Sequence, residues 1–243
     1  MITNRQENIL NNLVEEYIKT AKPISSELLE KKYSFNFCPA TIRSEMKALT
    51  DMGYLIQPHT SAGRIPTNKA YRFFVDKFME LNSDKDIGSF DIKELEAIKR
   101  LYQKHLKFAE NLTKTIAAFS SNLAFVYLYN EDFLYKEGWK EVFKNPEFEE
   151  REFLESFIET VEDFEKNIKR LKEEKDNCSR VKIYIGREKS FLNSPEFSIV
   201  FSEGAFFDKG QGIMAILGPN RMAYDKNIYL IDSIIKELEN YDR

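Results

Sequence analysis

Cysteine and histidine are scarce in this 243-residue chain, which has two of each. Cys38 and Cys178 are far apart and share no metal-ligand spacing, so we interpret both as free thiols. His59 has no Cys, His or carboxylate partner at ligand spacing either. The sequence therefore predicts no metal or cofactor. An enzyme is the least favoured class, because no nucleophile, general base or metal cluster stands out.

Long apolar runs are also missing. No stretch approaches the roughly 18 to 20 apolar residues that a membrane-spanning helix needs. Residues 1–10 mix charged and polar side chains, unlike the apolar core of a signal peptide. These absences predict a soluble, cytoplasmic protein. Residues 210–212 (Gly-Gln-Gly) precede an apolar segment typical of a strand, which favours a turn over a phosphate-binding loop.

Charge is divided unevenly along the chain. Residues 1–78 hold 11 Lys and Arg against 8 Asp and Glu, a net charge of +3. The whole chain has a formal net charge of -4, which leaves -7 for the remainder. Attraction to phosphate needs only a local positive field, so the sequence favours a DNA-binding N-terminal module on an acidic body.

The first 80 residues predict a winged helix-turn-helix. Apolar residues at helical spacing predict a helix over 4–20. A second helix should start at Ser25 or Ser26 and end by Tyr33, and a third should run from Pro39 until Gly53 supplies a left-handed stop. Strand-like residues 54–57, a tight loop at 60–66 and a helix over 67–78 then complete the order of a winged helix.

The remainder predicts an α+β domain. We place the DNA-binding domain at 1–80, a polar linker at 81–90 and the second domain at 91–243. The second domain should hold helices and strands over these ranges: helix 91–119, strand 123–129, helix 148–174, strands 181–185, 197–201 and 213–218, and helix 227–240.

The third helix should carry the DNA-reading side chains. Ile42, Met46 and Leu49 share one apolar stripe, which leaves an outward face of Thr41, Arg43, Ser44 and Lys47. Arg43 suits bidentate binding of guanine, Thr41 and Ser44 suit base edges or phosphate, and Lys47 suits phosphate. A solvated helix face is the open alternative.

The wing contributes the other candidate DNA contacts. Ser61 and Gly63 are small enough for close backbone approach, and Arg64 is suited to a narrow minor groove or to phosphate. His59 is a turn residue that can reach phosphate. A plain hairpin connection is the alternative for this loop.

Several segments resemble one family specifically. The segments that closely resemble the HrcA heat-inducible repressors are 39–43 (PATIR), 53–67 (GYLIQPHTSAGRIPT), 71–72, 145–148 (NPEF), 210–213 (GQGI) and 217–224 (LGPNRMAY). The resemblance implies a winged helix joined to a GAF-like domain, and a homodimer on an inverted-repeat operator called CIRCE. It also implies repression of chaperone operons and a GroEL-type chaperonin as partner.

The chain departs from the family pattern in places. Cys38 stands where the family usually has Ser, Ser44 where Asn is common, and Ala70 where Gly is common. The region near 130–180, where the family carries an inserted dimerisation domain, is shortened.

Two other functions remain open at this stage. One is a ligand-sensing regulator with a different operator, in which Arg221 and Tyr224 line a pocket; a buried Arg paired with a carboxylate fits Arg221 equally well. The other is an interaction module whose winged helix no longer binds DNA.

Overall fold

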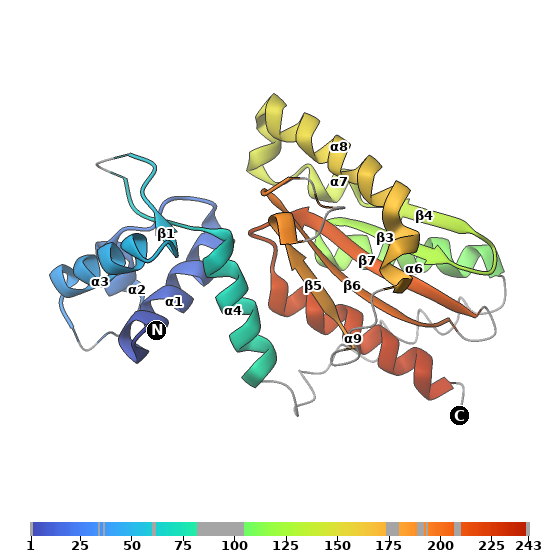
Figure 1. The fold of residues 1–243 in the computed structure, drawn as a ribbon, viewed down its shortest axis with the longest axis horizontal. Helices are drawn as coiled ribbons and strands as arrows, with labels where there is room; N and C mark the ends of the chain where they lie inside the picture. The colour runs from blue at the N-terminus through green and yellow to red at the C-terminus, as the bar shows by residue number, and fades with distance from the viewer. Residues whose placement is uncertain are drawn as a thin grey trace. The chain divides into compact units, whose positions relative to one another are not determined.

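A computed structural model gives the fold (Figure 1). The residues that it describes are 2–33, 35, 37–59, 62–81, 105–173, 180–188, 192, 194–206 and 210–241. The chain divides into two compact units, Met1–Ser83 and Asp84–Arg243. The predicted linker begins at Leu81, the last residue of a helix, and its other residues lie outside the described part of the chain.

The N-terminal unit is a winged helix. Its elements are α1 (Asn4–Thr20), α2 (Ser26–Lys32), α3 (Pro39–Asp51), β1 (Leu55–Ile56), β2 (Ile65–Pro66) and α4 (Asn68–Leu81). β1 and β2 pair antiparallel, with Leu55 opposite Pro66 and Ile56 opposite Ile65. The four helices and the hairpin predicted for this region are confirmed.

Local chemistry sets the ends of these helices. Thr3 and Gln6 form a reciprocal capping box at the start of α1, and the Ser25 hydroxyl accepts a hydrogen bond from the Leu28 amide at the start of α2 (3.2 Å). Gly53 has φ +77°, a left-handed conformation that glycine adopts without strain, and it turns the chain from α3 toward β1.

The apolar stripes of the helices meet in one core. They bury Ile9, Leu10, Leu13 and Val14 of α1, Ile42, Met46 and Leu49 of α3, and Ala70, Tyr71 and Val75 of α4. Full burial of each large aliphatic side chain contributes about 1.5–3 kcal/mol. The core thereby fixes which side of α3 faces outward.

The C-terminal unit contains a five-stranded antiparallel sheet of order β4-β3-β7-β6-β5. Its strands are β3 (Leu123–Leu128), β4 (Phe133–Glu137), β5 (Lys182–Ile185), β6 (Phe197–Ala205) and β7 (Gln211–Pro219). The central strands pair over long stretches, with Phe125 opposite Ala215 and Phe201 opposite Ala215 on its other side. The predicted α+β class is confirmed.

Helices cover both faces of this sheet (Figure 1). α8 (Arg151–Asn167) packs Phe157, Val161 and Phe164 on one face, together with α7 (Trp139–Val142). α6 (His105–Ser120) and α9 (Tyr224–Tyr241) lie on the other face, against β3 and β6 respectively. The result is a three-layer arrangement consistent with a GAF-like domain.

Three predictions for this unit need correction. The helix predicted over 148–174 is interrupted: Pro146–Glu149 and Ile168–Glu173 are 3-10 helices, and only Arg151–Asn167 is α-helical. Glu150, between the first 3-10 helix and α8, has an extended conformation (φ -85°, ψ 122°) and separates the two helices. β4 and α7 were not predicted, and α9 begins at Tyr224 instead of Asn227. Residues 91–104 of the predicted long helix lie outside the described residues.

Arg221 joins two of the family-like segments. Its guanidinium pairs with the Glu147 carboxylate, through Nη2 to Oε2 at 2.9 Å among other contacts, and with Asn145 Oδ1 at 3.0 Å. Tyr224 is fully buried, with its hydroxyl 2.7 Å from that of Ser198. Arg221 is therefore paired with a carboxylate, as one of the two interpretations predicts, although it is partly buried and not fully buried. Within the described residues, no helix is long and apolar enough to cross a membrane.

Candidate nucleic-acid interface

The outward face of α3 is polar and basic. Ile42, Met46 and Leu49 are buried as the spacing predicts, whereas Arg43, Ser44 and Lys47 are exposed and Thr41 is half-buried. A helix presented in this way has the size and the side chains to enter a major groove. The four residues predicted for α3 therefore lie together on the side away from the core.

The start of α3 is weakly capped. Cys38 is the N-cap residue and makes no side-chain capping bond, while its Sγ lies 3.5 Å from Thr41 Oγ1. The nearby Thr41 hydroxyl is the main cause that lowers the pKa of the Cys38 thiol. The Thr41 hydroxyl is thus engaged locally in this structure.

Arg43 is held by a residue of another helix. Its Nη2 donates to Glu27 Oε1 of α2 at 2.8 Å, and both side chains remain largely exposed, at 72% and 57%. The Glu27 backbone amide and the Ser25 hydroxyl donate hydrogen bonds that lower the pKa of the Glu27 carboxyl, and the Arg43 charge acts in the same direction. The carboxylate is therefore ionised at neutral pH.

The wing is attached to the chain segment before α2. Arg64 and Ile24 form an isolated antiparallel bridge, with amide-to-carbonyl distances of 2.9 and 2.8 Å in the two directions. Ile24 acts as a one-residue third strand beside β2. Sequence reasoning missed this bridge because a single residue leaves no periodic signal.

Gly63 allows that attachment. A Cβ atom at Gly63 would lie 2.4 Å from the carbonyl carbon and oxygen of Ile24 and 2.7 Å from its nitrogen. Backbone atoms cannot move aside as a side chain can. The small size of Gly63 therefore serves a contact within the protein, whether or not it also serves DNA.

Gly63→Ala is expected to displace the wing and to destabilise the N-terminal unit by about 1–3 kcal/mol, the usual cost of overpacking. Urea unfolding followed by circular dichroism measures the loss. Ala62→Ser is the matched control, since it changes the neighbouring residue without filling the gap. Equal stability of Gly63→Ala and wild type would contradict the predicted clash.

Arg64 links the wing to α3. Its Nε donates to Thr50 Oγ1 at 3.1 Å, and the Thr50 hydroxyl in turn donates to the Met46 carbonyl at 2.8 Å. The half-buried Arg64 side chain therefore points toward α3. This contact fixes the distance between the wing and the outward face of α3.

A groove of about 380 Å³ lies between these elements. Arg43 and Arg64 both line it, one from α3 and one from the wing. The other lining residues are Ser25, Ser26, Glu27, Met46, Gln57, Ala62 and Gly63. Two guanidinium groups in a polar groove can bind phosphate or base oxygens.

The tip of the wing is partly described. His59 is exposed, and its carbonyl accepts a hydrogen bond from the Ala62 amide at 2.9 Å, which closes a turn. Ile56 on β1 is 48% exposed. Ser61 lies outside the described residues.

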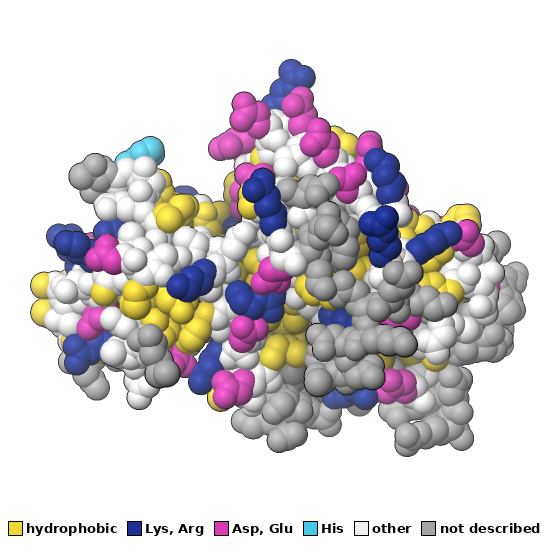
Figure 2. Space-filling view, in the orientation of Figure 1, with side chains coloured by type: hydrophobic (Ala, Val, Ile, Leu, Met, Phe, Trp, Pro, Cys, Tyr) yellow, Lys and Arg dark blue, Asp and Glu magenta, His cyan; other side chains and the backbone are white. Residues whose placement is uncertain are grey.

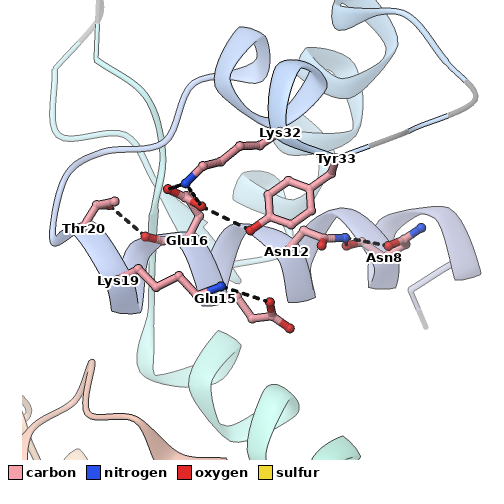
Figure 3. Close-up of polar contacts among 8 residues, drawn as sticks. All are labelled: Asn8, Asn12, Glu15, Glu16, Lys19, Thr20, Lys32 and Tyr33. Atoms are coloured by element: carbon pink, nitrogen blue, oxygen red, sulfur yellow. Dashed lines mark hydrogen bonds and ion pairs between the residues drawn. The ribbon is translucent and has the colours of Figure 1, made fainter.

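An ion pair between a buried carboxylate and a half-exposed lysine joins two helices of the same unit (Figure 3). Glu16 of α1 is 1% exposed, and its carboxylate accepts hydrogen bonds from Lys32 Nζ at 2.6 and 2.8 Å and from the Tyr33 hydroxyl at 3.2 Å. The bond from Lys32 lowers the pKa of Glu16, and burial raises the pKa of Tyr33 to about 12. These contacts join the end of α2 to α1.

The C-terminal unit presents a surface of opposite charge. Acidic side chains gather over α8 in Figure 2, where Glu152, Glu155, Glu159 and Glu162 are exposed. Such a face repels phosphate. No group of three potential metal ligands occurs among the described residues.

Two family models match the chain. One, described as the HrcA winged helix-turn-helix transcription repressor DNA-binding domain, matches residues 1–79. The other, described as the HrcA protein C-terminal domain, matches residues 73–228. The latter covers more than half of the chain.

This chain is similar to proteins named heat-inducible transcription repressor HrcA. The protein of Natranaerobius thermophilus is 56% identical over 75 residues, 31% of this chain and 22% of that protein. The protein of Brevibacillus brevis is 39% identical over 123 residues, 51% of this chain and 34% of that protein. These matches therefore span about a fifth to a third of the relatives' lengths.

A longer alignment links the chain to the Thermodesulfovibrio yellowstonii protein of the same name. It is 26% identical over 340 aligned positions and covers 98% of this chain and 97% of that protein. Because 340 exceeds the length of this chain, the alignment contains gaps in it. The crystal structure of a hypothetical protein shares the fold, with a TM-score of 0.75 at 18% identity over 100% of this chain and 99% of that one.

Proposed function

The chain belongs to the HrcA family, and on that premise we propose that it is a cytoplasmic transcription repressor that binds duplex DNA through its winged helix. One observation carries the proposal: the exposed Arg43, Ser44 and Lys47 face of α3 lies beside a groove that Arg43 and Arg64 both line. Phosphate contacts from Lys47 and Arg64 would position the protein, and Arg43 would read a base.

We propose that two chains act together as a homodimer on a CIRCE-type inverted repeat, as the sequence resemblance implies. Each chain would place α3 in one of two successive major grooves, about 34 Å apart, so that the symmetry of the operator matches that of the dimer. Occupancy of the operator would block transcription of chaperone operons.

A fluorescence-anisotropy titration tests the DNA-binding proposal. We expect an inverted-repeat duplex to bind about a thousand-fold more tightly than a scrambled duplex. The logarithm of affinity should fall linearly with the logarithm of salt concentration, because each phosphate contact releases counterions. Equal, weak binding to both duplexes would contradict the proposal and favour a ligand-dependent regulator with another operator.

We further propose that a GroEL-type chaperonin keeps the repressor folded and that heat diverts the chaperonin to unfolded clients. Active repressor would then fall as free chaperonin falls. The test is refolding of the purified chain with and without chaperonin, scored by the fraction able to bind the operator. A higher fraction with chaperonin is expected, and equal fractions would refute this mode of heat sensing.

A further inference from the structure

An acidic side chain lies within the candidate DNA-binding groove. Glu27 lines the groove with Arg43 and Arg64, although the proposed ligand is a polyanion. Its ion pair with Arg43 is largely exposed, and exposed pairs contribute little to stability, typically 0–1 kcal/mol. A carboxylate in the first turn of α2 favours that helix, and the Glu27 amide and Ser25 hydroxyl hydrogen-bond it, but neither effect requires the pairing with Arg43.

The geometry of the pair leaves Arg43 able to bind a base. A guanidinium has five N–H donors in a rigid plane, and Nη2 gives a hydrogen bond to Glu27 Oε1 at 2.8 Å. A carboxylate at one side restricts the rotamers of the long Arg side chain before DNA arrives. A side chain that is already ordered loses less entropy on binding, and this lowers the cost of a contact that requires one orientation.

We infer that Glu27 is a specificity-determining positioning residue, which holds Arg43 in the orientation that binds a guanine edge and weakens its attraction to phosphate elsewhere. The inference rests on the proposed function and adds a residue of α2 to it. A bidentate contact to guanine O6 and N7 needs a fixed plane, whereas contact with phosphate tolerates many orientations. Glu27 therefore lowers the affinity for DNA in general and raises the discrimination between bases.

Removal of the Glu27 charge should change two quantities in opposite directions: the affinity for every duplex should rise, and the preference for guanine should fall. Loss of a negative charge near DNA should strengthen binding to every duplex, by about 2- to 5-fold at low salt. Loss of positioning should reduce the preference for guanine at one base pair by about 10-fold, a part of the discrimination that a bidentate contact supplies. A carboxylate that only competed with DNA for Arg43 would give the first effect without the second.

The experiment is selection of binding sites from a library of randomised duplexes by the full chain. Wild type, Glu27→Gln and Arg43→Ala are compared position by position, and urea melts check that each variant is folded. Glu30→Gln is the matched control, since it removes the same charge from α2 at an exposed residue outside the groove lining. Glu27→Gln is expected to lose the guanine preference at the position that Arg43→Ala loses, and to keep the other positions.

Three results would overturn the inference. If Glu27→Gln selected the same bases as wild type, with equal or higher affinity, Glu27 would be only a competitor for Arg43. If the wild-type chain selected no sequence at all, the proposed function would fail and the inference with it. Loss of preference at every position in a folded Glu27→Gln variant would also overturn it, because the effect would not act through Arg43 alone.

Discussion

Arg43→Ala is expected to weaken binding to the inverted-repeat duplex by about 100-fold. One bidentate arginine–guanine contact contributes roughly 1–3 kcal/mol of discrimination, and a dimer would make two. Arg43 is 72% exposed and pairs with Glu27, which is itself exposed, so removal of the Arg43 side chain should not disturb the core. Anisotropy titrations at fixed salt measure the loss.

Lys47→Ala distinguishes base-specific contacts from general attraction to DNA phosphates. Lys47 is exposed on the same face of α3 and is suited to phosphate, so its loss should weaken binding to specific and scrambled duplexes alike. The salt slope should fall by about one unit per lost phosphate contact. If Arg43→Ala behaved like Lys47→Ala on both duplexes, Arg43 would contact phosphate and the assignment of base reading to it would be wrong.

Lys32→Met is expected to destabilise the N-terminal unit by about 2 kcal/mol. The substitution leaves the buried Glu16 carboxylate without the two hydrogen bonds from Lys32 Nζ. Breaking a fully buried pair costs about 3–5 kcal/mol. The value expected here is smaller, because the Lys32 side chain is 51% exposed and water already reaches it.

Equilibrium unfolding in urea distinguishes the two units. Circular dichroism follows the helices of both, whereas the single Trp139 lies in α7 of the C-terminal unit. We expect an earlier circular dichroism transition in Lys32→Met and an unchanged Trp139 fluorescence transition. If the urea-unfolding curve of Lys32→Met were identical to that of wild type, the ion pair would contribute nothing to the free energy of unfolding.

The same pair predicts a pH dependence with a definite sign. In the folded protein the pKa of Glu16 lies below its usual 4.5, chiefly because of the hydrogen bond from Lys32. This stabilisation is complete above pH 4.5 and is lost as the pH falls through the folded pKa. Without Lys32 the largest cause of the lowered Glu16 pKa is removed, so the difference in stability between wild type and Lys32→Met should shrink in acid. If the stability difference between wild type and Lys32→Met did not depend on pH, the ionised Glu16 carboxylate would not be its cause. As a control, Glu16→Gln should abolish the pH dependence.

Much of the N-terminal unit could be predicted because its determinants are local. Helix ends follow from Ser25, Pro39 and Gly53, each of which acts on backbone atoms within a few residues. The inward stripe of α3 follows from the 3.6-residue period. The C-terminal unit was harder, since no residue of β4 is buried and its side chains show no alternation between apolar and polar, although β4 forms a hairpin with β3 directly before it.

The amino-acid sequence by itself determined the order of helices and hairpin, the outward face of α3 and the family, because periodicity, caps and motifs are read along the chain. Only the tertiary structure decided which side chains meet. It brought Glu27 to Arg43, Lys32 to Glu16 and Ile24 to Gly63, pairs separated by 16, 16 and about 40 residues. The physical reason is that such contacts depend on how one helix or strand packs against another. Periodicity along the chain shows which face of an element is apolar, but not which other element packs against it.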